Sequence, residues 1–229
     1  MLNQEERVTL VSPHQPVTYD ASYLAYHNTI VSTLACRRVM LDAALAELMT
    51  RAMALVEVAT LLVEALRAGH KVLVAGNGGS AAEAQHFAAE LVGRFKQERA
   101  PYAVLSLTTD TSIITAVAND YGYHDIFARQ VLAFGKPGDL LIGFSTSGES
   151  ENLVRAATVG RQSLMKIVAI TGDRPSRLEE LADVTVRVPV VDTAIAQELH
   201  MLVTHILCDI AESELVCCND AMGEGDANK

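Results

Sequence analysis

Five short apolar segments, separated by stretches with helical patterning, constrain the fold of this chain more than any other feature. They are residues 71–75, 102–107, 140–144, 166–171 and 184–189. The segments are continuously apolar rather than alternating, which is typical of parallel strands buried on both faces of a sheet. We therefore predict an α/β fold with one doubly wound parallel sheet of about five strands. Ligands bind such sheets beyond the carboxyl ends of the strands.

A helical segment precedes the predicted sheet. From Ala21 to Ala68 the chain contains neither Gly nor Pro, and apolar residues recur at helical spacing. We predict two long helices here, with a break near residues 36–40. The segment either packs against another subunit or covers one face of the sheet, and the pattern does not distinguish the two.

The predicted domain organisation is simple. Residues 1–18 are polar and contain Pro13 and Pro16, so we predict a flexible N-terminal arm. A single domain, which includes the N-terminal helices, follows over residues 19–216 and ends in a helix over about residues 194–215. We predict that residues 217–229 form a disordered tail.

Composition and charge disfavour several classes of protein. The formal net charge of −10 opposes an extended contact with nucleic acid, which depends on Lys and Arg. The four cysteines show no Cys-x-x-Cys, so neither a disulfide framework nor a zinc ribbon is predicted. The N-terminus lacks the apolar core of a signal peptide, and no run approaches the roughly 18 apolar residues of a membrane span. We expect a cytoplasmic protein with no nucleic-acid partner and no membrane contact.

Two loops follow predicted strands and precede predicted helices. The first, Gly76–Ser80, reads Gly-Asn-Gly-Gly-Ser, and the second, Ser145–Ser150, reads Ser-Thr-Ser-Gly-Glu-Ser. Backbone N–H groups at a helix start, together with hydroxyl donors, suit a phosphate. We therefore predict that both loops bind one sugar phosphate.

Two other interpretations of the first loop remain open. Gly76, Gly78 and Ala81 match the Gly-x-Gly-x-x-Ala pattern of dinucleotide sites. That interpretation is disfavoured because the acidic residue expected at the end of the second strand comes late, at Asp110, and because NAD does not need a hydroxyl-rich second loop. The glycines could also serve only a tight turn without a ligand.

Two helical stretches carry candidate acids, bases and metal ligands. His86 and Glu90 lie four residues apart, on one face of a helix, where they can bind a metal, share a proton transfer or form a surface contact. The last helix offers Gln197 and His205, about 12 Å apart along the helix axis, so both reach one metal only if their side chains lean together. His200 does not share a helix face cleanly with either Gln197 or His205, and we predict that it is structural or exposed.

Four motifs occur in a fixed order along the chain. They are residues 74–91 (VAGNGGSAAEAQHFAAEL), residues 118–122 (ANDYG), residues 145–148 (STSG), and residues 197–200 (QELH) followed by His205. Together they resemble the phosphoheptose isomerases, or sedoheptulose 7-phosphate isomerases, of the sugar isomerase (SIS) domain superfamily. The likeness spans about residues 25–215.

The resemblance implies a flavodoxin-like SIS domain and a reaction. The reaction is the conversion of sedoheptulose 7-phosphate to D-glycero-D-manno-heptose 7-phosphate by an enediol mechanism, for ADP- or GDP-heptose or a related sugar. The implied assembly is a homotetramer with sites at subunit interfaces, and the implied cofactor is Zn²⁺, one per subunit.

The resemblance also implies roles for individual residues. Glu90 matches the base and His205 its acid partner, and His86, Glu90, Gln197 and His205 match zinc ligands. Zinc would lower the basicity of a coordinated Glu90, so its two roles compete. The positions that match substrate contacts are Asn77, Gly78, Gly79, Ser80, Arg94, Asp110, Ser145, Thr146, Ser147, Ser150 and Gln197.

Two departures from the family pattern concern the choice of sugar. Ile195-Ala196 stands where many relatives carry Arg-Ile, and Glu149 adds a negative charge to the second loop.

The principal alternative to an isomerase is a non-catalytic SIS-domain regulator that binds a sugar phosphate or a replication initiator protein. Such a module has no use for Glu90 and His205 together, so their presence favours an enzyme. A dinucleotide-dependent oxidoreductase is the third candidate function.

Overall fold

The computed structural model describes residues 9–12, 15–18 and 21–223. The chain divides into two compact units, residues 1–46 and 47–229. The division falls inside the first long helix, whereas the sequence predicts one domain over residues 19–216. The two units are described separately below, and every candidate site residue belongs to the second.

The first unit contains a strand pair and most of one helix. Strands β1 (Thr9–Ser12) and β2 (Gln15–Thr18) pair antiparallel within the segment predicted to be a flexible arm, while the rest of that arm lies outside the described residues. Helix α1 (Ala21–Thr50) runs on into the second unit. It is continuous through residues 36–40, so the predicted break there is wrong; no Gly or Pro interrupts the helix at that point.

The helical segment is interrupted at Arg51 instead. Its backbone N–H bonds to the carbonyl of Leu48, three residues back, and helix α2 (Ala52–Arg67) starts at the next residue. The Arg51 guanidinium pairs with Asp173 at 2.8 Å and also with Glu47. No sequence signal marks this position, where Arg51 pairs with a residue more than 100 positions away.

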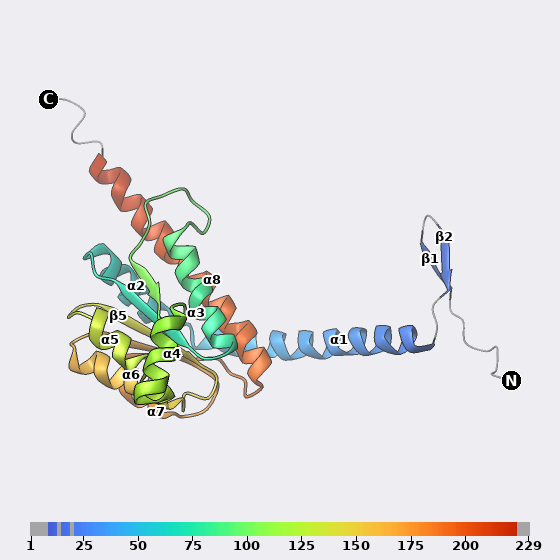
Figure 1. Cartoon of the computed structure of the whole chain (residues 1–229). Coiled ribbons are helices and arrows are strands. Elements are labelled where there is room, and N and C mark those ends of the chain that lie inside the picture. Colours follow the sequence, from blue (N-terminus) through green and yellow to red (C-terminus); the bar gives the residue numbers. More distant parts are fainter. Residues whose placement is uncertain (1–8, 13–14, 19–20, 224–229) are drawn as a thin grey trace. The chain divides into compact units, whose positions relative to one another are not determined.

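A five-stranded parallel sheet forms the centre of the second unit (Figure 1). Its strands, in chain order, are β3 (Val72–Gly76), β4 (Val104–Ser106), β5 (Leu140–Ser145), β6 (Lys166–Thr171) and β7 (Val184–Arg187). Their spatial order is β4-β3-β5-β6-β7, and every neighbouring pair is parallel. This is the flavodoxin-like order, so the predicted doubly wound fold is confirmed.

Helices connect the strands, and a last helix follows β7. They are α3 (Gly79–Val92), α4 (Thr111–Tyr121), the 3₁₀ turn η1 (Tyr123–Asp125), α5 (Ala128–Phe134), α6 (Glu151–Gln162), α7 (Arg177–Leu181) and α8 (Thr193–Gly223). Helix α8 extends beyond Leu215, so the tail predicted to be disordered begins inside it. Residues 224–229 of that tail lie outside the described residues.

The core occupies both faces of the sheet. On one face, side chains of β3, β5 and β6, such as Leu73, Leu141 and Ile167, pack with helices α5, α6 and α7. On the other face, Phe144 of β5 packs against Phe87 of α3, with ring centroids 6.4 Å apart. Helices α3 and α8 lie against each other over this second face (Figure 1).

The strand order positions the ligand-binding end of the sheet. Strands β3 and β5 are neighbours although β4 lies between them in the sequence. The chain leaves β3 and β5 in opposite directions across the sheet, and ligands of doubly wound proteins bind at such a switch point. The two glycine- and serine-rich loops follow these two strands, and they therefore lie side by side.

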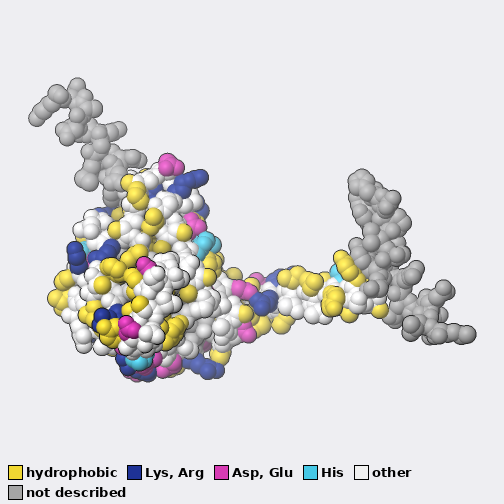
Figure 2. All heavy atoms as spheres, viewed as in Figure 1, with side chains coloured by type: hydrophobic (Ala, Val, Ile, Leu, Met, Phe, Trp, Pro, Cys, Tyr) yellow, Lys and Arg dark blue, Asp and Glu magenta, His cyan; other side chains and the backbone are white. Residues whose placement is uncertain are grey.

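The surface of the second unit mixes charges of both signs. Figure 2 shows acidic and basic side chains interspersed with apolar ones on the face in view. This mixture agrees with the acidic net charge of the chain. Among the described residues, no helix combines the length and the apolar character that a membrane crossing requires.

Candidate active site

The loop after β3 brings the start of helix α3 close to the end of the strand. Gly78 has φ +58°, in the left-handed region that favours glycine. A Cβ on Gly76 would lie 2.5 Å from the backbone carbonyl carbon of Ser80, so the turn leaves no room for a side chain there. The tight turn lets α3 begin at Gly79, with its N-terminus at the carboxyl end of the sheet, where an anion is favoured.

A reciprocal amide pair joins this loop to helix α6. The Asn77 side-chain amide donates to Asn152 Oδ1 at 2.9 Å, and that of Asn152 donates to Asn77 Oδ1 at 2.8 Å. The Tyr123 hydroxyl donates to the same Asn77 oxygen at 3.0 Å. Asn152 is buried. Neither Asn152 nor Tyr123 was singled out from the sequence, although each stands next to a recognised motif.

The loop after β5 uses part of its hydroxyl set to shape itself. Ser145 is buried, and its Oγ accepts a hydrogen bond from the N–H of Gly148, a residue with φ +66°. The exposed Ser147 accepts from the N–H of Glu149, and Ser150 stands immediately before α6 with its side chain not bonded as a cap. Thr146 lies half-buried between Ser145 and Ser147.

The Glu149 carboxylate forms a hydrogen bond at the start of helix α7. Its Oε1 accepts a hydrogen bond from the backbone N–H of Arg177 at 3.0 Å. The pKa of the Arg177 guanidinium is raised, mainly by its hydrogen bond to Glu151 and in smaller part by the charge of Glu149. The negative charge that Glu149 adds to the loop is therefore partly offset by a helix N-terminus and an arginine.

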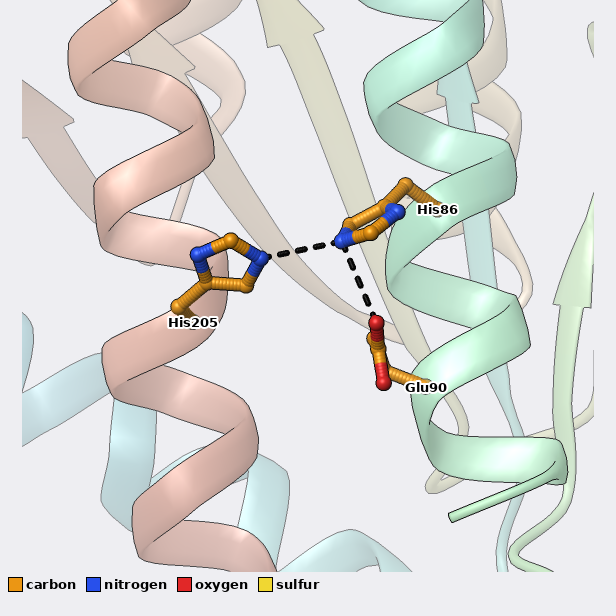
Figure 3. A group of neighbouring side chains, drawn as sticks. All are labelled: His86, Glu90 and His205. Atoms are coloured by element: carbon orange, nitrogen blue, oxygen red, sulfur yellow. Dashed lines mark hydrogen bonds and ion pairs between the residues drawn. The ribbon is translucent and has the colours of Figure 1, made fainter. Parts of the chain in front are cut away.

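Three potential metal ligands meet between helices α3 and α8. His86 Nε2 lies 2.9 Å from His205 Nε2 and 3.2 Å from Glu90 Oε1. Figure 3 shows His86 and Glu90 on one face of α3 and His205 reaching towards them from α8. All three side chains are half-buried, and their ligand atoms lie within 4.8 Å of one another. We name this group the His86–Glu90–His205 cluster.

The chemistry of the cluster fits a zinc ion. Two imidazole nitrogens and a carboxylate oxygen form a donor set found at catalytic zinc sites, which keep a further position open for water or substrate. Without metal, the 2.9 Å contact needs one of the two facing nitrogens to carry a proton. Nearby, burial and then the charge of Glu90 raise the pKa of the Cys208 thiol to about 12. Cys208 therefore stays protonated at neutral pH.

The structure places Gln197 at the opposite end of the α3–α8 contact. A Cβ on Gly79 would lie 2.7 Å from Gln197 Cδ, so only glycine admits the amide there. Gln197 precedes His205 by eight residues, about 12 Å along the helix. Its amide lies at the start of α3, in an open hollow of about 430 Å³ that Gly79, Glu83 and Gln197 help to line. The Gln197 amide therefore lies beside the glycine-rich loop, at the start of α3.

The remaining predicted contacts have local partners. Ser80 is buried in the first turn of α3. Arg94, just past the end of α3, is exposed, and its Nε lies 3.7 Å from Glu98. Asp110 caps helix α4 by accepting the N–H of Ile113 at 2.9 Å.

His200 is structural rather than exposed. It is completely buried on α8, and its Nδ1 lies 3.4 Å from Oε2 of the buried Glu83 on α3. Within the described part of the chain, neither of these two side chains has a partner in hydrogen-bonding geometry. The pair joins α3 to α8 between Gln197 and the His86–Glu90–His205 cluster.

The chain is similar to known proteins in both sequence and fold. The family model described as SIS domain matches residues 39–172. The phosphoheptose isomerase of Rhodospirillum rubrum is 47% identical over 162 residues, which cover 71% of this chain and 86% of the relative. That of Aliarcobacter butzleri is 51% identical over 153 residues, 67% of this chain and 81% of the relative. The solved phosphoheptose isomerase of Neisseria gonorrhoeae is 38% identical, with a TM-score of 0.75, and the match covers 80% of this chain and 99% of that one.

Proposed function

We propose, because this chain belongs to the phosphoheptose isomerase family of SIS-domain proteins, that it is an aldose–ketose isomerase. Its substrate is sedoheptulose 7-phosphate and its product D-glycero-D-manno-heptose 7-phosphate. The observation that carries the proposal is the meeting of Glu90 with His86 and His205. Glu90 and His86 lie on helix α3, which begins in the glycine-rich loop.

The loops bind the phosphate group, and the His86–Glu90–His205 cluster carries out proton transfer. The loops after β3 and β5, with the N-terminus of α3, bind the phosphate group. Carbonyl transfer from C2 to C1 then needs a base that removes a proton from C1 and returns it to C2 of the resulting enediolate. The Glu90 carboxylate is this base, and His205 moves the hydroxyl proton between O2 and O1. Because His86 contacts both groups, it holds them in one arrangement.

Zinc is the proposed cofactor, one per subunit, and His86, Glu90 and His205 would hold it. Bound there, zinc would polarise the substrate carbonyl and stabilise negative charge on oxygen. Gln197, expected as a fourth ligand, has its amide beside Gly79, so its part in this proposal is a contact with the substrate. A zinc-bound Glu90 is a weaker base, and the two roles of this side chain therefore compete.

A homotetramer with sites at subunit interfaces is the proposed assembly. In helix α1, Tyr26, Ile30 and Leu34 recur every four residues, and each side chain is more than half exposed. A regular apolar stripe of this kind is typical of a helix that another chain covers. Size-exclusion chromatography with light scattering tests the assembly: Ile30→Glu combined with Leu34→Glu should lower the mass of the particle. An unchanged particle would exclude this stripe as an interface.

Incubation with sedoheptulose 7-phosphate in deuterated water tests the activity. An isomerase that moves a proton through a base incorporates deuterium at C2 of an aldose product, because the base exchanges its proton with solvent. Binding of the sugar phosphate with neither product nor exchange would instead support the non-catalytic regulator. Tight NAD binding would support the oxidoreductase.

A further inference from the structure

The loop that follows helix α3 is fastened to helix α8 by one buried carboxylate. Glu212, only 1% exposed, accepts hydrogen bonds from three successive backbone N–H groups, those of Phe95 at 3.0 Å, Lys96 at 2.6 Å and Gln97 at 2.8 Å. Burial acts to raise the pKa of this carboxyl, but these bonds and the charge of Arg99 outweigh burial and lower it. Glu212 is therefore an ionised anchor for the loop at neutral pH.

Arg99 connects the same carboxylate to the end of helix α3. Its Nε donates to Glu212 Oε1 at 3.1 Å, and the two side chains are only 3% and 1% exposed. Its Nη2 donates to the backbone carbonyl of Glu90 at 2.9 Å, and its Nη1 to those of Leu91 and Gly93. The last carbonyls of a helix lack partners within the helix, and a guanidinium here satisfies them. The residue that carries the proposed base is thus tied to α8 through Arg99 and Glu212.

The anchored loop carries an aromatic ring to the His86–Glu90–His205 cluster. The ring of Phe95 stacks on the His205 imidazole, with centroids 5.6 Å apart and an angle of 21° between the planes. The N–H of Phe95 is the first of the three that Glu212 accepts. Lys96 pairs with Asp209 of α8 at 2.9 Å and lies over the same ring, 5.0 Å from its centroid. The backbone N–H and the ring of Phe95 therefore both contact side chains of helix α8.

The buried pair contributes specificity as well as stability. A buried Arg–Glu pair by itself loses about as much in desolvation as it gains in attraction, but here the two side chains also satisfy backbone groups that apolar residues would leave unpaired. A fully hydrogen-bonded polar network also selects one geometry. Here that geometry links the carbonyl of Glu90, the ring of Phe95 and helix α8.

We propose that Phe95, held by Glu212 and Arg99, is a positioning residue that fixes the plane of the His205 imidazole relative to Glu90. The proposal rests on the proposed isomerase function for its effect on rate. The contact of Phe95 with His205 can be measured whether or not the protein is an isomerase.

Histidine-labelled protein provides that independent measurement. A phenyl ring stacked on an imidazole shifts the imidazole ring protons upfield in the NMR spectrum. We expect the His205 ring protons of the wild type to lie upfield of those of the half-buried His124, and to lose this shift in Phe95→Leu. Phe95→Tyr keeps an aromatic ring and should retain the shift. A wild-type His205 without the upfield shift would overturn the proposal, even if no variant folds.

Kinetics test the consequence for turnover. Phe95→Leu should lower kcat roughly tenfold and leave KM within a few fold, which is the scale of one aromatic contact. Phe95→Tyr should restore kcat, and Phe134→Leu on α5, a partly exposed ring, serves as the control. Equal kcat values in Phe95→Leu and the control would show that the ring does not position His205. A wild type with the NMR shift but without activity would refute the isomerase function alone.

Hydrogen exchange tests the anchor. Glu212→Gln should speed exchange at the amides of Phe95, Lys96 and Gln97 while the amides of α3 and α8 stay protected. Glu212→Asp keeps the charge on a shorter side chain, so its exchange rates at these three amides should lie between those of the wild type and Glu212→Gln. If the three amides exchange at the wild-type rate in Glu212→Gln, the carboxylate does not hold the loop.

Discussion

His86 Nε2 and His205 Nε2 lie 2.9 Å apart although 119 residues separate them in the sequence. One histidine belongs to the helix that leaves the glycine-rich loop and the other to the last helix. Their contact, with Glu90 at 3.2 Å from His86, brings a carboxylate and two imidazoles to one place. A phosphate pocket alone would suit a sensor as well as an enzyme, and this contact adds the proton-transfer groups that an isomerase needs.

Glu90→Gln should abolish turnover and leave sugar phosphate binding within a few fold. The amide keeps the size of the side chain but cannot take a proton from carbon. Turnover is followed by the aldose product, and binding by calorimetry. Glu57→Gln, at an exposed position of α2, is the matched control. Near wild-type turnover in Glu90→Gln would exclude Glu90 as the base.

Removal of zinc should lower activity, and return of zinc should restore it. His86→Ala should also lower the zinc content of the purified protein, because it removes one of three facing donors. Metal content is measured by elemental analysis, with His124→Ala on η1 as the control. Full activity in a preparation with no measurable metal would show that the cluster works without an ion.

Asn152→Ala should weaken substrate binding more than turnover. The buried Asn152 amide fixes Asn77 in the first loop, and its loss leaves the Asn77 side chain without two of its hydrogen bonds. We expect KM to rise roughly tenfold, the effect of about 1.4 kcal/mol, with kcat within a few fold. Gln162→Ala, exposed at the far end of the same helix, should match the wild type. An unchanged KM in Asn152→Ala would separate this amide pair from phosphate binding.

Glu83 and His200 should be coupled in stability. Either Glu83→Ala or His200→Ala removes the 3.4 Å contact and leaves the other polar side chain buried between α3 and α8, at a cost of about 1–3 kcal/mol. The double variant should lose less than the sum of the two single losses. Urea unfolding of the four proteins measures the difference. If the two single losses in the free energy of unfolding add exactly in the double variant, the 3.4 Å contact does not contribute to stability.

Asp139 should make the protein sensitive to acid. Burial acts to raise the pKa of this carboxyl, but hydrogen bonds from the side chain and N–H of Lys71 and from the N–H of Lys136 outweigh burial and lower it. The folded pKa lies below the unfolded value of about 3.9, so the unfolded state binds more protons between the two. The stabilisation is complete above the unfolded pKa and is lost as pH falls through the folded pKa.

Asp139→Asn should therefore be less stable than the wild type at neutral pH and should lose less stability on acidification below about pH 4. Thermal unfolding across the pH range measures this, with Glu57→Gln as the control. A variant whose stability falls with pH as steeply as that of the wild type would assign the acid sensitivity to other groups.

Local patterns predicted much of the second unit. Continuous apolar runs identified all five strands, because a parallel strand buried on both faces needs apolar side chains on both. The glycine and serine loops were identifiable because few residue types permit such turns. The shared face of His86 and Glu90 follows from helix geometry alone. The start of α2 at Ala52 and the pairing of β1 with β2 had no comparable signal.

The amino-acid sequence by itself thus determined the sheet, the two loops and the residue types of the site, because each depends on neighbours within a few positions. The tertiary structure decided which of those residues touch. His205 meets His86, Asn77 meets Asn152, and Phe95 covers His205 only because α8 packs against α3 and β5 lies beside β3. It also placed Gln197 beside Gly79 and buried His200 against Glu83. Spacing along one helix does not reveal which side chain of another helix it will face, since that depends on how the two helices pack.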